Sequence, residues 1–254
     1  MTQFIDSTNL IGKSQSGWNT LGLLDGFSAT GKLFWIYEWE AAQKDVGSGS
    51  GVVDRPNLER IKAYTDRVTS EFCVIDIESK AAEFRLVPHL APQYLRASEI
   101  ANPNTTWIWY NTHEWPPTWP VTRKPTTSEL SAWWKQWDNN RHFYDAFTAG
   151  LVSFYPDSID YVSNVMPYMI QAFSRQFGSR PKIWNMAVQT FVGDDATSPI
   201  KDLALLDAEL SLLRTSIDDG LLDYVSIWGL FNASLPRLDI SLEAELIELL
   251  HQYV

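Results

Sequence analysis

The sequence predicts an α/β fold with parallel strands, and three observations support this prediction. Apolar runs of strand length alternate along the chain with stretches of helical periodicity. These runs are almost continuously apolar, which is typical of parallel sheets that helices cover on the outside. Six or seven such units in 254 residues fit a (β/α)8-type TIM barrel, either complete or with seven strands or one irregular unit. We therefore expect residues 1–254 to form a single domain.

A doubly wound open sheet is the alternative to a barrel. It is disfavoured because no glycine-rich phosphate loop follows an early strand. The strand candidates are residues 32–39, 72–78, 105–111, 149–155, 182–188 and 223–229. An additional N-terminal strand is expected at 3–8 or at 22–27, and the sequence does not choose between them.

Stretches with helical periodicity lie between the strand candidates. They cover residues 55–71, 157–178, 198–220 and 241–253. Asp54 suits an N-cap for the first, and Gly178 ends the second as glycine often ends a helix. Ser198 before Pro199 predicts the start of the third, as an N-cap followed by proline in the first turn.

Composition narrows the range of partners. The net charge of −11 argues against nucleic acid and anionic membranes, since binding to either needs a basic surface. No apolar run approaches the roughly 20 residues that cross a bilayer. The first ten residues lack the basic start and apolar stretch of a secretory signal. We expect a soluble protein, either cytoplasmic or exported by a route that this sequence does not reveal.

The residues that bind metals are few and scattered. The four histidines form no pair at helical or zinc-finger spacing, so we expect no metal site and no cofactor. Cys73 is the single cysteine and lies in an apolar strand candidate. Burial as an inert thiol is therefore its expected state, and no internal disulfide is possible. The sequence does not predict an oligomeric state.

In a barrel of this type the chemistry lies at the carboxyl ends of the strands. The polar and aromatic residues at the predicted ends are Glu38, Asp76, Glu78, Tyr110, Asn111, Tyr155, Trp228 and Asn232. Acids, amides and aromatic rings without a basic cluster are typical of sugar recognition and of acid catalysis at a glycosidic bond. Phosphate chemistry would instead call for a cluster of basic residues.

Asp76 and Glu78 form the most specific feature of these strand ends. Because they are two residues apart on a strand, both side chains point to one face, and they share that face with Val74. Two carboxylates held close together cannot both ionise easily, so one stays protonated and can act as a general acid. The alternative is that these acids cap the next helix or pair with Lys80 and Arg85.

A long segment rich in proline and tryptophan follows the fourth strand candidate. It runs over residues 115–137 and is expected to overhang the mouth of the barrel. Trp115 and Trp119 would stack on sugar rings there. Trp133, Trp134 and Trp137 have helical spacing and are expected to cover the core instead.

The order of several segments resembles the hyaluronidase family of glycoside hydrolases. The segment "CVIDIES" is close to the V-I-D-x-E motif that ends an early barrel strand in that family. Further segments are similar to family segments in the same order: "GVVDRPNLERIKAYTDRV", "TTWIWYN", "LVSFYPDS" and "YVSIWGLFN". The resemblance covers roughly residues 47–232.

The resemblance implies cleavage of a glycan with a 2-acetamido sugar by a substrate-assisted, retaining mechanism. Glu78 would protonate the leaving oxygen, and Asp76 would steady the acetamido group whose carbonyl attacks the anomeric carbon. Tyr155 would hydrogen-bond that group, and Tyr110 and Trp228 would wall the sugar pocket. The acidity of the chain argues against a grip on a carboxylate-bearing polymer, so a neutral or differently charged N-acetylated glycan is expected as much as hyaluronan. A catalytically silent glycan-binding or structural barrel and a muramidase-like cell-wall hydrolase are the alternatives.

Overall fold

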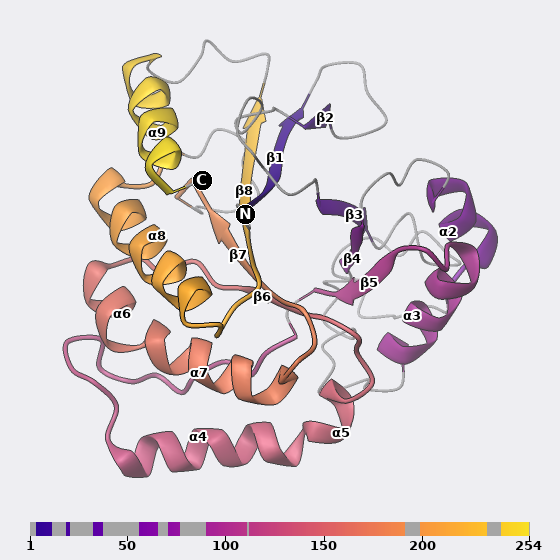
Figure 1. The fold of residues 1–254 in the computed structure, drawn as a ribbon, viewed down its shortest axis with the longest axis horizontal. Helices are drawn as coiled ribbons and strands as arrows, with labels where there is room; N and C mark the ends of the chain where they lie inside the picture. Colours follow the sequence, from indigo (N-terminus) through magenta and orange to yellow (C-terminus); the bar gives the residue numbers. More distant parts are fainter. Residues whose placement is uncertain are drawn as a thin grey trace.

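Parallel strands of two sheets form the centre of the molecule, and helices cover the outside (Figure 1). The computed structural model describes residues 4–11, 19–20, 33–37, 56–65, 71–76, 90–110, 112–190, 199–232 and 240–253. The larger sheet has the strand order β2-β1-β8-β7-β6, and the smaller one has the order β3-β4-β5. All pairs are parallel except β1 with β2.

The strands lie close to the predicted positions. They are β1 (Phe4–Ile11), β2 (Asn19–Thr20), β3 (Leu33–Tyr37), β4 (Phe72–Asp76), β5 (Thr106–Trp109), β6 (Gly150–Ser153), β7 (Lys182–Ala187) and β8 (Tyr224–Asn232). All six strand candidates are confirmed, and β1 shows that the N-terminal strand is the one expected near 3–8. The other option, 22–27, lies outside the described residues.

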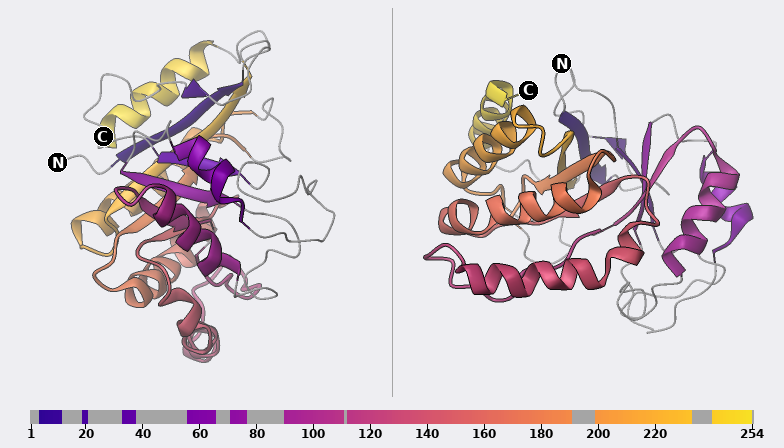
Figure 2. Two further views of the ribbon diagram at one scale, coloured as in Figure 1. Left: turned by 90° about the vertical axis from the view of Figure 1, so that its right-hand side faces the viewer. Right: turned by 60° about the horizontal axis from the view of Figure 1, so that its bottom comes forward.

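The helices divide into two groups. They are α2 (Leu58–Thr65), α3 (Leu90–Ala101), α4 (Thr127–Asn139), α5 (Arg141–Tyr144), α6 (Ile159–Asn164), α7 (Met166–Phe177), α8 (Leu203–Asp218) and α9 (Ile240–Tyr253). Figure 1 and Figure 2 show α2 and α3 beside the smaller sheet, and α4 to α9 on the side of the larger one.

Three predicted helix boundaries are wrong. The stretch 157–178 is two helices, because Pro167 in the first turn of α7 has no N–H with which to continue α6. Helix α8 begins at Leu203 and is capped by Asp202, which accepts from the Leu205 N–H at 3.0 Å. Helix α2 begins at Leu58 and is capped by Asn57, whose Oδ1 accepts two N–H bonds. The predicted caps Ser198 and Asp54 themselves lie outside the described residues.

The apolar side chains form two clusters. One lies between the strands and the helices. The other contains inward-facing residues from strands of both sheets and from Ala149, which precedes β6; its members are Ile5, Phe72, Val74, Ile108, Ala149, Leu151 and Ile183. Tyr110 and Tyr224 pack against it. The inner faces of the two sheets therefore share one core, as in a barrel.

The two sheets are joined by hydrogen bonds of Thr112, just after β5. Its backbone N–H donates to the Leu151 carbonyl of β6 at 2.9 Å, and its Oγ1 accepts from the Leu151 N–H at 2.6 Å. Between the residues that are described, β5 and β6 do not otherwise pair as strands. The fold is thus α/β with parallel sheets, and closure into a complete barrel stays a prediction.

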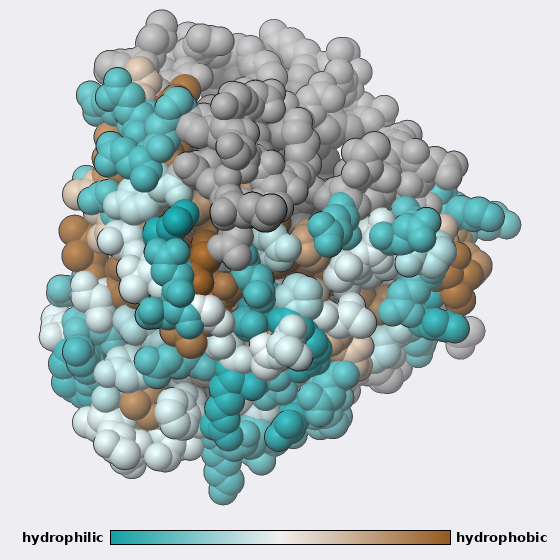
Figure 3. All heavy atoms as spheres, viewed as in Figure 1, coloured by the Kyte–Doolittle hydropathy of each residue, from teal (hydrophilic) through white to brown (hydrophobic). Residues whose placement is uncertain are grey.

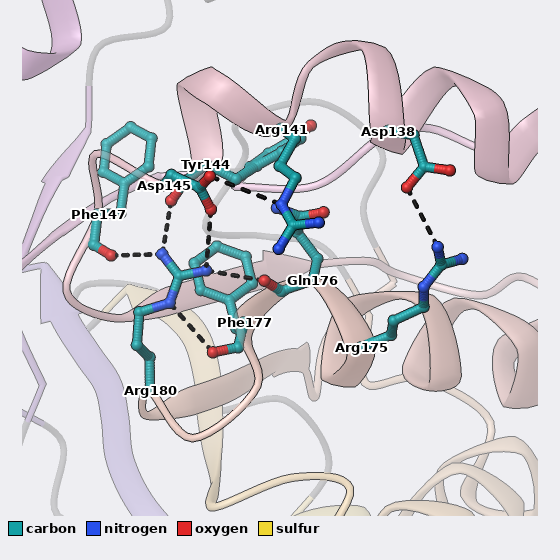
Figure 4. A network of polar contacts seen from close by, with 9 residues as sticks. All are labelled: Asp138, Arg141, Tyr144, Asp145, Phe147, Arg175, Gln176, Phe177 and Arg180. Atoms are coloured by element: carbon teal, nitrogen blue, oxygen red, sulfur yellow. Dashed lines mark hydrogen bonds and ion pairs between the residues drawn. The ribbon is translucent and has the colours of Figure 1, made fainter.

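Arg180 ties the end of α7 to the end of α5, as Figure 4 shows. Its guanidinium donates to four backbone carbonyls at 2.7–3.0 Å, those of Tyr144, Phe147, Gln176 and Phe177. The same group lies over the Phe177 ring at 4.6 Å and within 3.8 Å of an Asp145 oxygen. One side chain thereby satisfies carbonyls that the ends of two short helical segments leave open.

Helices α2 and α3 expose part of their apolar surface. Leu58 and Ile100 are 43% and 58% exposed and flank a shallow groove of about 400 Å³. Figure 3 shows apolar side chains on the edge of the molecule where these two helices lie. Ile61 in the same helix as Leu58 is fully buried, so only one side of α2 packs on the sheet.

Candidate functional site

The acid at the end of β4 lies on the inner face of the sheet. Phe72 and Val74 belong to the inner cluster, whereas Cys73 and Ile75 belong to the outer one. Since side chains alternate along a strand, Asp76 faces inward with Val74 and is half-buried there. The condition on which the sequence argument depended, an inward Val74, is therefore met.

Tyr110 follows the neighbouring strand and also faces inward. It packs against the inner cluster, while Trp107 and Trp109 on the alternate positions belong to the outer one. The Tyr110 N–H donates to the Ile75 carbonyl at 3.0 Å, which extends the pairing of β4 and β5 to this residue. Asp76 and Tyr110 thus stand beside each other at the carboxyl end of the smaller sheet.

The larger sheet carries three inward-facing layers on β6, β7 and β8. Strand register places Leu151, Ile183 and Tyr224 side by side as an apolar floor. Two residues further on, Ser153, Asn185 and Ser226 form a buried polar row. Two residues beyond that row, nearest the carboxyl ends, come Tyr155, Ala187 and Trp228.

The rings of Tyr155 and Trp228 stack across Ala187. Their centroids are 6.0 Å apart and their planes differ by 25°. Ala187 pairs with Trp228 on the neighbouring strand and is fully buried. The small side chain of Ala187 leaves room for the rings of Tyr155 and Trp228 to meet. The register of β7 places this alanine between them and so determines the pair of rings, called the aromatic wall below.

Asn185 connects the polar row to the aromatic wall. Its Nδ2 donates to the Ser153 Oγ at 3.1 Å and to the Tyr155 hydroxyl oxygen at 3.2 Å. The side chain is fully buried, and its Oδ1 has no hydrogen-bond partner among the residues that the structure describes. Trp184 on the other face packs in the outer core, whereas Asn185 contacts a predicted site residue.

Trp115 and Trp119 have different environments. Trp115 is 45% exposed and contacts the rings of His113 and Phe154, with centroids 4.7 and 5.5 Å away. Trp119 is only 8% exposed and packs edge-to-face on Trp133 at 5.3 Å. The expectation that Trp119 stacks on sugar is therefore wrong, because the ring is buried against α4.

A groove of about 350 Å³ begins at Tyr155. Its lining comes from the turn after β5, the segment after β6 and the start of α6: Pro116, Pro117, Thr118, Trp119, Val121, Phe154, Tyr155, Pro156, Asp157, Tyr161 and Val165. Burial raises the pKa of Tyr161 above its usual range, and the charge of Asp157 adds to this effect. Its hydroxyl lies 4.0 Å from the Met169 sulfur, and its ring stacks on Phe154 with centroids 4.8 Å apart.

Behind Trp115, a buried carboxylate anchors the segment that carries it. The Glu114 Oε1 accepts from the Asn140 Nδ2 at 2.6 Å and from the Tyr144 hydroxyl at 2.8 Å. Glu114 is 1% exposed. The sequence analysis did not identify this acid. Tyr144 lies in α5 and Asn140 lies between α4 and α5, so Glu114 ties its segment to these two helices.

Several predicted site residues lie outside what the structure describes. Glu38, Glu78 and Asn111 belong to this group, and their placement stays a prediction. Asn232 is the last residue of β8, but only its backbone is described. The described part of the chain therefore contains one acid of the pair, Asp76, together with Tyr110, Trp115, Tyr155 and Trp228.

Metal ligands do not gather in the described part of the chain. No group of three or more His, Cys, Asp or Glu side chains lies close enough there to hold an ion. Cys73 is buried in the outer core, as expected. None of the described helices is long and apolar enough to cross a membrane.

No protein-family model and no curated protein matches this chain. Among solved structures it is similar to bee venom hyaluronidase in complex with a hyaluronic acid tetramer. The two chains share 15% sequence identity, and the TM-score is 0.48. The match covers 87% of this chain and 83% of that chain. An endo-beta-1,3-glucanase from Amycolatopsis mediterranei in complex with laminarihexaose shares 10% identity over 98% of this chain and 99% of that chain, with a TM-score of 0.49.

A third similar structure is a putative alpha-L-fucosidase from Bacteroides thetaiotaomicron. It shares 12% identity over 77% of this chain and 60% of that chain, with a TM-score of 0.47. The identities are low and the TM-scores lie below 0.5, so the function of this chain has to be inferred from the geometry of its own site.

Proposed function

We propose that this chain is a glycoside hydrolase that acts on a glycan containing a 2-acetamido sugar. The observation that carries the proposal is the set of inward-facing side chains at the carboxyl strand ends. Asp76 and Tyr110 stand there on one sheet, and Tyr155 and Trp228 stand there on the other. Closure into a (β/α)8-type TIM barrel, which the Thr112 bonds between β5 and β6 support, brings both sets to one mouth.

The aromatic wall suits a sugar ring. A flat indole or phenol face buries the apolar C–H face of a pyranose without removing its hydroxyls from water. Trp228 and Tyr155 offer such faces inside the mouth, and the half-exposed Trp115 offers another beyond it. Tyr155 also lines the groove of about 350 Å³, which offers room for further sugar units beside this wall.

The proposed reaction follows from the resemblance to the hyaluronidase family. Glu78 donates its proton to the glycosidic oxygen as the bond from that oxygen to the anomeric carbon breaks. The carbonyl oxygen of the substrate's own acetamido group attacks the anomeric carbon, and Asp76 accepts the N–H of that group. Water, deprotonated by the Glu78 carboxylate, then attacks the same carbon and opens the cyclic intermediate. Both acids end in their starting states.

Turnover on a panel of glycans tests the proposal. The panel contains hyaluronan, chitin oligosaccharides, purified peptidoglycan and laminarin, and new reducing ends are measured. We expect cleavage of a glycan with 2-acetamido sugars and none of laminarin. Glu78→Gln should lower the rate by about 1,000-fold, because the general acid is lost while the fold remains. Glu99→Gln, at an exposed acid of α3, is the matched control and should leave the rate unchanged.

Near-normal turnover by Glu78→Gln would mean that the acid is assigned to the wrong residue. The second candidate function is a catalytically silent glycan-binding barrel, which the described aromatic wall favours because it needs no acid. That candidate predicts binding without turnover on every glycan of the panel. A muramidase-like hydrolase would instead clear purified peptidoglycan and leave chitin oligosaccharides and hyaluronan intact.

A further inference from the structure

The groove beside Tyr155 is built from three segments that hold one another in place. The first lies within residues 116–121, the second is 154–157, and the third is the region of α6. The Asn164 Nδ2 donates to the Val121 carbonyl at 2.8 Å, which ties the first segment to α6. Prolines in the first two segments restrict the backbone further. The groove is therefore largely preformed, and a ligand that enters it loses little free energy to ordering the chain.

The lining of this groove is mostly apolar and aromatic. Phe154 stacks on Tyr161, with ring centroids 4.8 Å apart, and prolines line the groove beside them. Surfaces of this type bury the C–H face of a pyranose. The volume of about 350 Å³ lies in the range of small-ligand pockets, about 300–1,000 Å³. Because Tyr155 belongs both to the groove and to the aromatic wall, the two surfaces adjoin each other.

The charge at the groove comes from Asp157. It is the one charged side chain among the described residues that line the groove. Asp157 is exposed, and no basic side chain in the described part of the chain forms an ion pair with it. Burial and, after it, the charge of Asp157 raise the pKa of Tyr161, so this carboxylate acts on a residue inside the groove.

An unpaired carboxylate in an apolar groove distinguishes three classes of sugar. It repels the carboxylate of a uronic acid, and the net charge of −11 adds to this repulsion. It is indifferent to the charge of a neutral sugar. It attracts a sugar that carries an ammonium group, which can donate a charge-assisted hydrogen bond to it. Such a sugar arises when the acetyl group is removed from a 2-acetamido unit.

We propose that this groove is a subsite for a 2-amino sugar, whose ammonium group donates to the Asp157 carboxylate. The inference rests on the proposed function and narrows its substrate class to glycans that are partly N-deacetylated. An acetamido unit at the mouth and an amino unit in the groove are then parts of one glycan chain.

Binding of three hexasaccharides tests the inference. They are a β-1,4-linked N-acetylglucosamine hexamer, a set of the same length with half of its acetamido groups replaced by amino groups in mixed order, and a hyaluronan hexamer. Calorimetry in the Glu78→Gln background at about pH 5.5 keeps them uncleaved, with Asp157 above the usual pKa of an aspartate and the amines protonated. We expect the parent to bind the amino set about fivefold more tightly than the acetylated hexamer, and hyaluronan most weakly.

Asp157→Asn should remove the preference for the amino set and strengthen the binding of hyaluronan, because one change of charge acts on the two ligands in opposite directions. Asp160→Asn is the matched control. Asp160 is exposed in the first turn of α6 and does not line the groove, so its replacement changes the net charge equally and should leave the preference intact.

Thr118→Trp tests the place of binding without changing any charge. Thr118 is exposed and lines the groove, so the larger ring should fill the groove while the fold remains, as circular dichroism would show. We expect this variant to lose the preference for the amino set as Asp157→Asn does. A preference that survives in folded Thr118→Trp would mean that the amino sugar binds outside the groove, which overturns the inference.

The outcomes separate this inference from the function beneath it. If the parent neither binds nor cleaves any glycan, the proposed function and the inference fail together. If the parent binds the acetylated hexamer without preferring the amino set, only the inference is overturned. Equal losses in Asp157→Asn and Asp160→Asn would also overturn it, because they would indicate a general attraction to an acidic chain. A loss confined to the Asp157 and Thr118 variants supports it.

Discussion

At the scale of single residues, the inner face of β7 shows what the sequence can and cannot predict. All six residues of this strand are buried, on the inner face as well as the outer one. A strand that is buried on both sides carries no alternation of polar and apolar residues, so the sequence does not show which way Asn185 points. Asp76 was easier to place, because an acid two residues after a buried valine shares its face.

Lys201 and Glu209 form a buried ion pair that the sequence analysis did not identify. The Nζ donates to the Glu209 Oε2 at 3.0 Å, and the two side chains are 5% and 0% exposed. Burial raises the pKa of Glu209 to about 7, and Lys201 partly opposes this rise. The pair joins the segment just before α8, which contains Lys201, to Glu209 within that helix.

The raised pKa of Glu209 makes stability depend on pH. Between about pH 4.5, the ordinary value, and about pH 7, the folded chain holds a proton that the unfolded chain has lost. The contribution of this group is therefore complete below pH 4.5 and decreases as the pH rises to 7. We expect the free energy of unfolding to fall over this window relative to the double variant Lys201→Met/Glu209→Leu, as measured by urea unfolding at each pH.

The single variant Glu209→Leu supplies the comparison at fixed pH. It leaves the Lys201 ammonium buried without its carboxylate and should cost about 3–5 kcal/mol, whereas the double variant should recover most of that loss. Parallel pH profiles for the wild type and the double variant would show that Glu209 titrates normally in the folded chain.

At the scale of elements, the strands were predictable, whereas several helix boundaries were wrong and helices α3 and α5 were not predicted. The six strand candidates are real because a continuous apolar run needs burial on both faces. The break between α6 and α7 was missed because the apolar periodicity continues across it, while Pro167 cannot supply the N–H that a continuous helix requires. Ser198 was a reasonable cap by sequence, but Ile200 pairs with Gln189 as a β-bridge, so the helix begins later.

The hydrogen bonds of Arg180 act between elements, because they join the end of α5 to the end of α7. Arg180→Lys should lower the free energy of unfolding by about 2 kcal/mol, because one ammonium cannot reach carbonyls that a planar guanidinium reaches together. Urea unfolding monitored by circular dichroism measures this change.

Arg175→Lys, in helix α7 just before Arg180, is the matched control (Figure 4). Arg175 pairs with Asp138 at 3.2 Å, and both side chains are more than half exposed, so its replacement should cost less than about 0.5 kcal/mol. Equal costs for the two variants would mean that the carbonyl contacts of Arg180 do not stabilise the helix ends.

At the scale of the whole molecule, the fold class was predictable because the alternation of strands and helices is a property of the entire chain. The parallel pairing of β3 to β5 and of β6 to β8 follows from that alternation. Closure of the ring depends on how distant strands meet and stays a prediction. The burial of the tryptophans differs as well. Trp107, Trp133 and Trp184 are fully buried in the core, while Trp115 is exposed. This difference depends on how the elements pack.

The hydroxyl of Thr112 makes two of the hydrogen bonds at the junction between the sheets. It holds the Leu151 amide hydrogen and also donates to the Leu151 carbonyl at 3.0 Å. Thr112→Val keeps the shape of the side chain and removes both bonds. We expect hydrogen–deuterium exchange at the Leu151 amide to accelerate about tenfold, with little change at the amides of β7 and β8.

Equal acceleration on both sheets would mean that the strands open as one unit. Local acceleration would mean that the junction between the two sheets opens while β7 and β8 stay paired. One hydroxyl group would then set how often this junction opens.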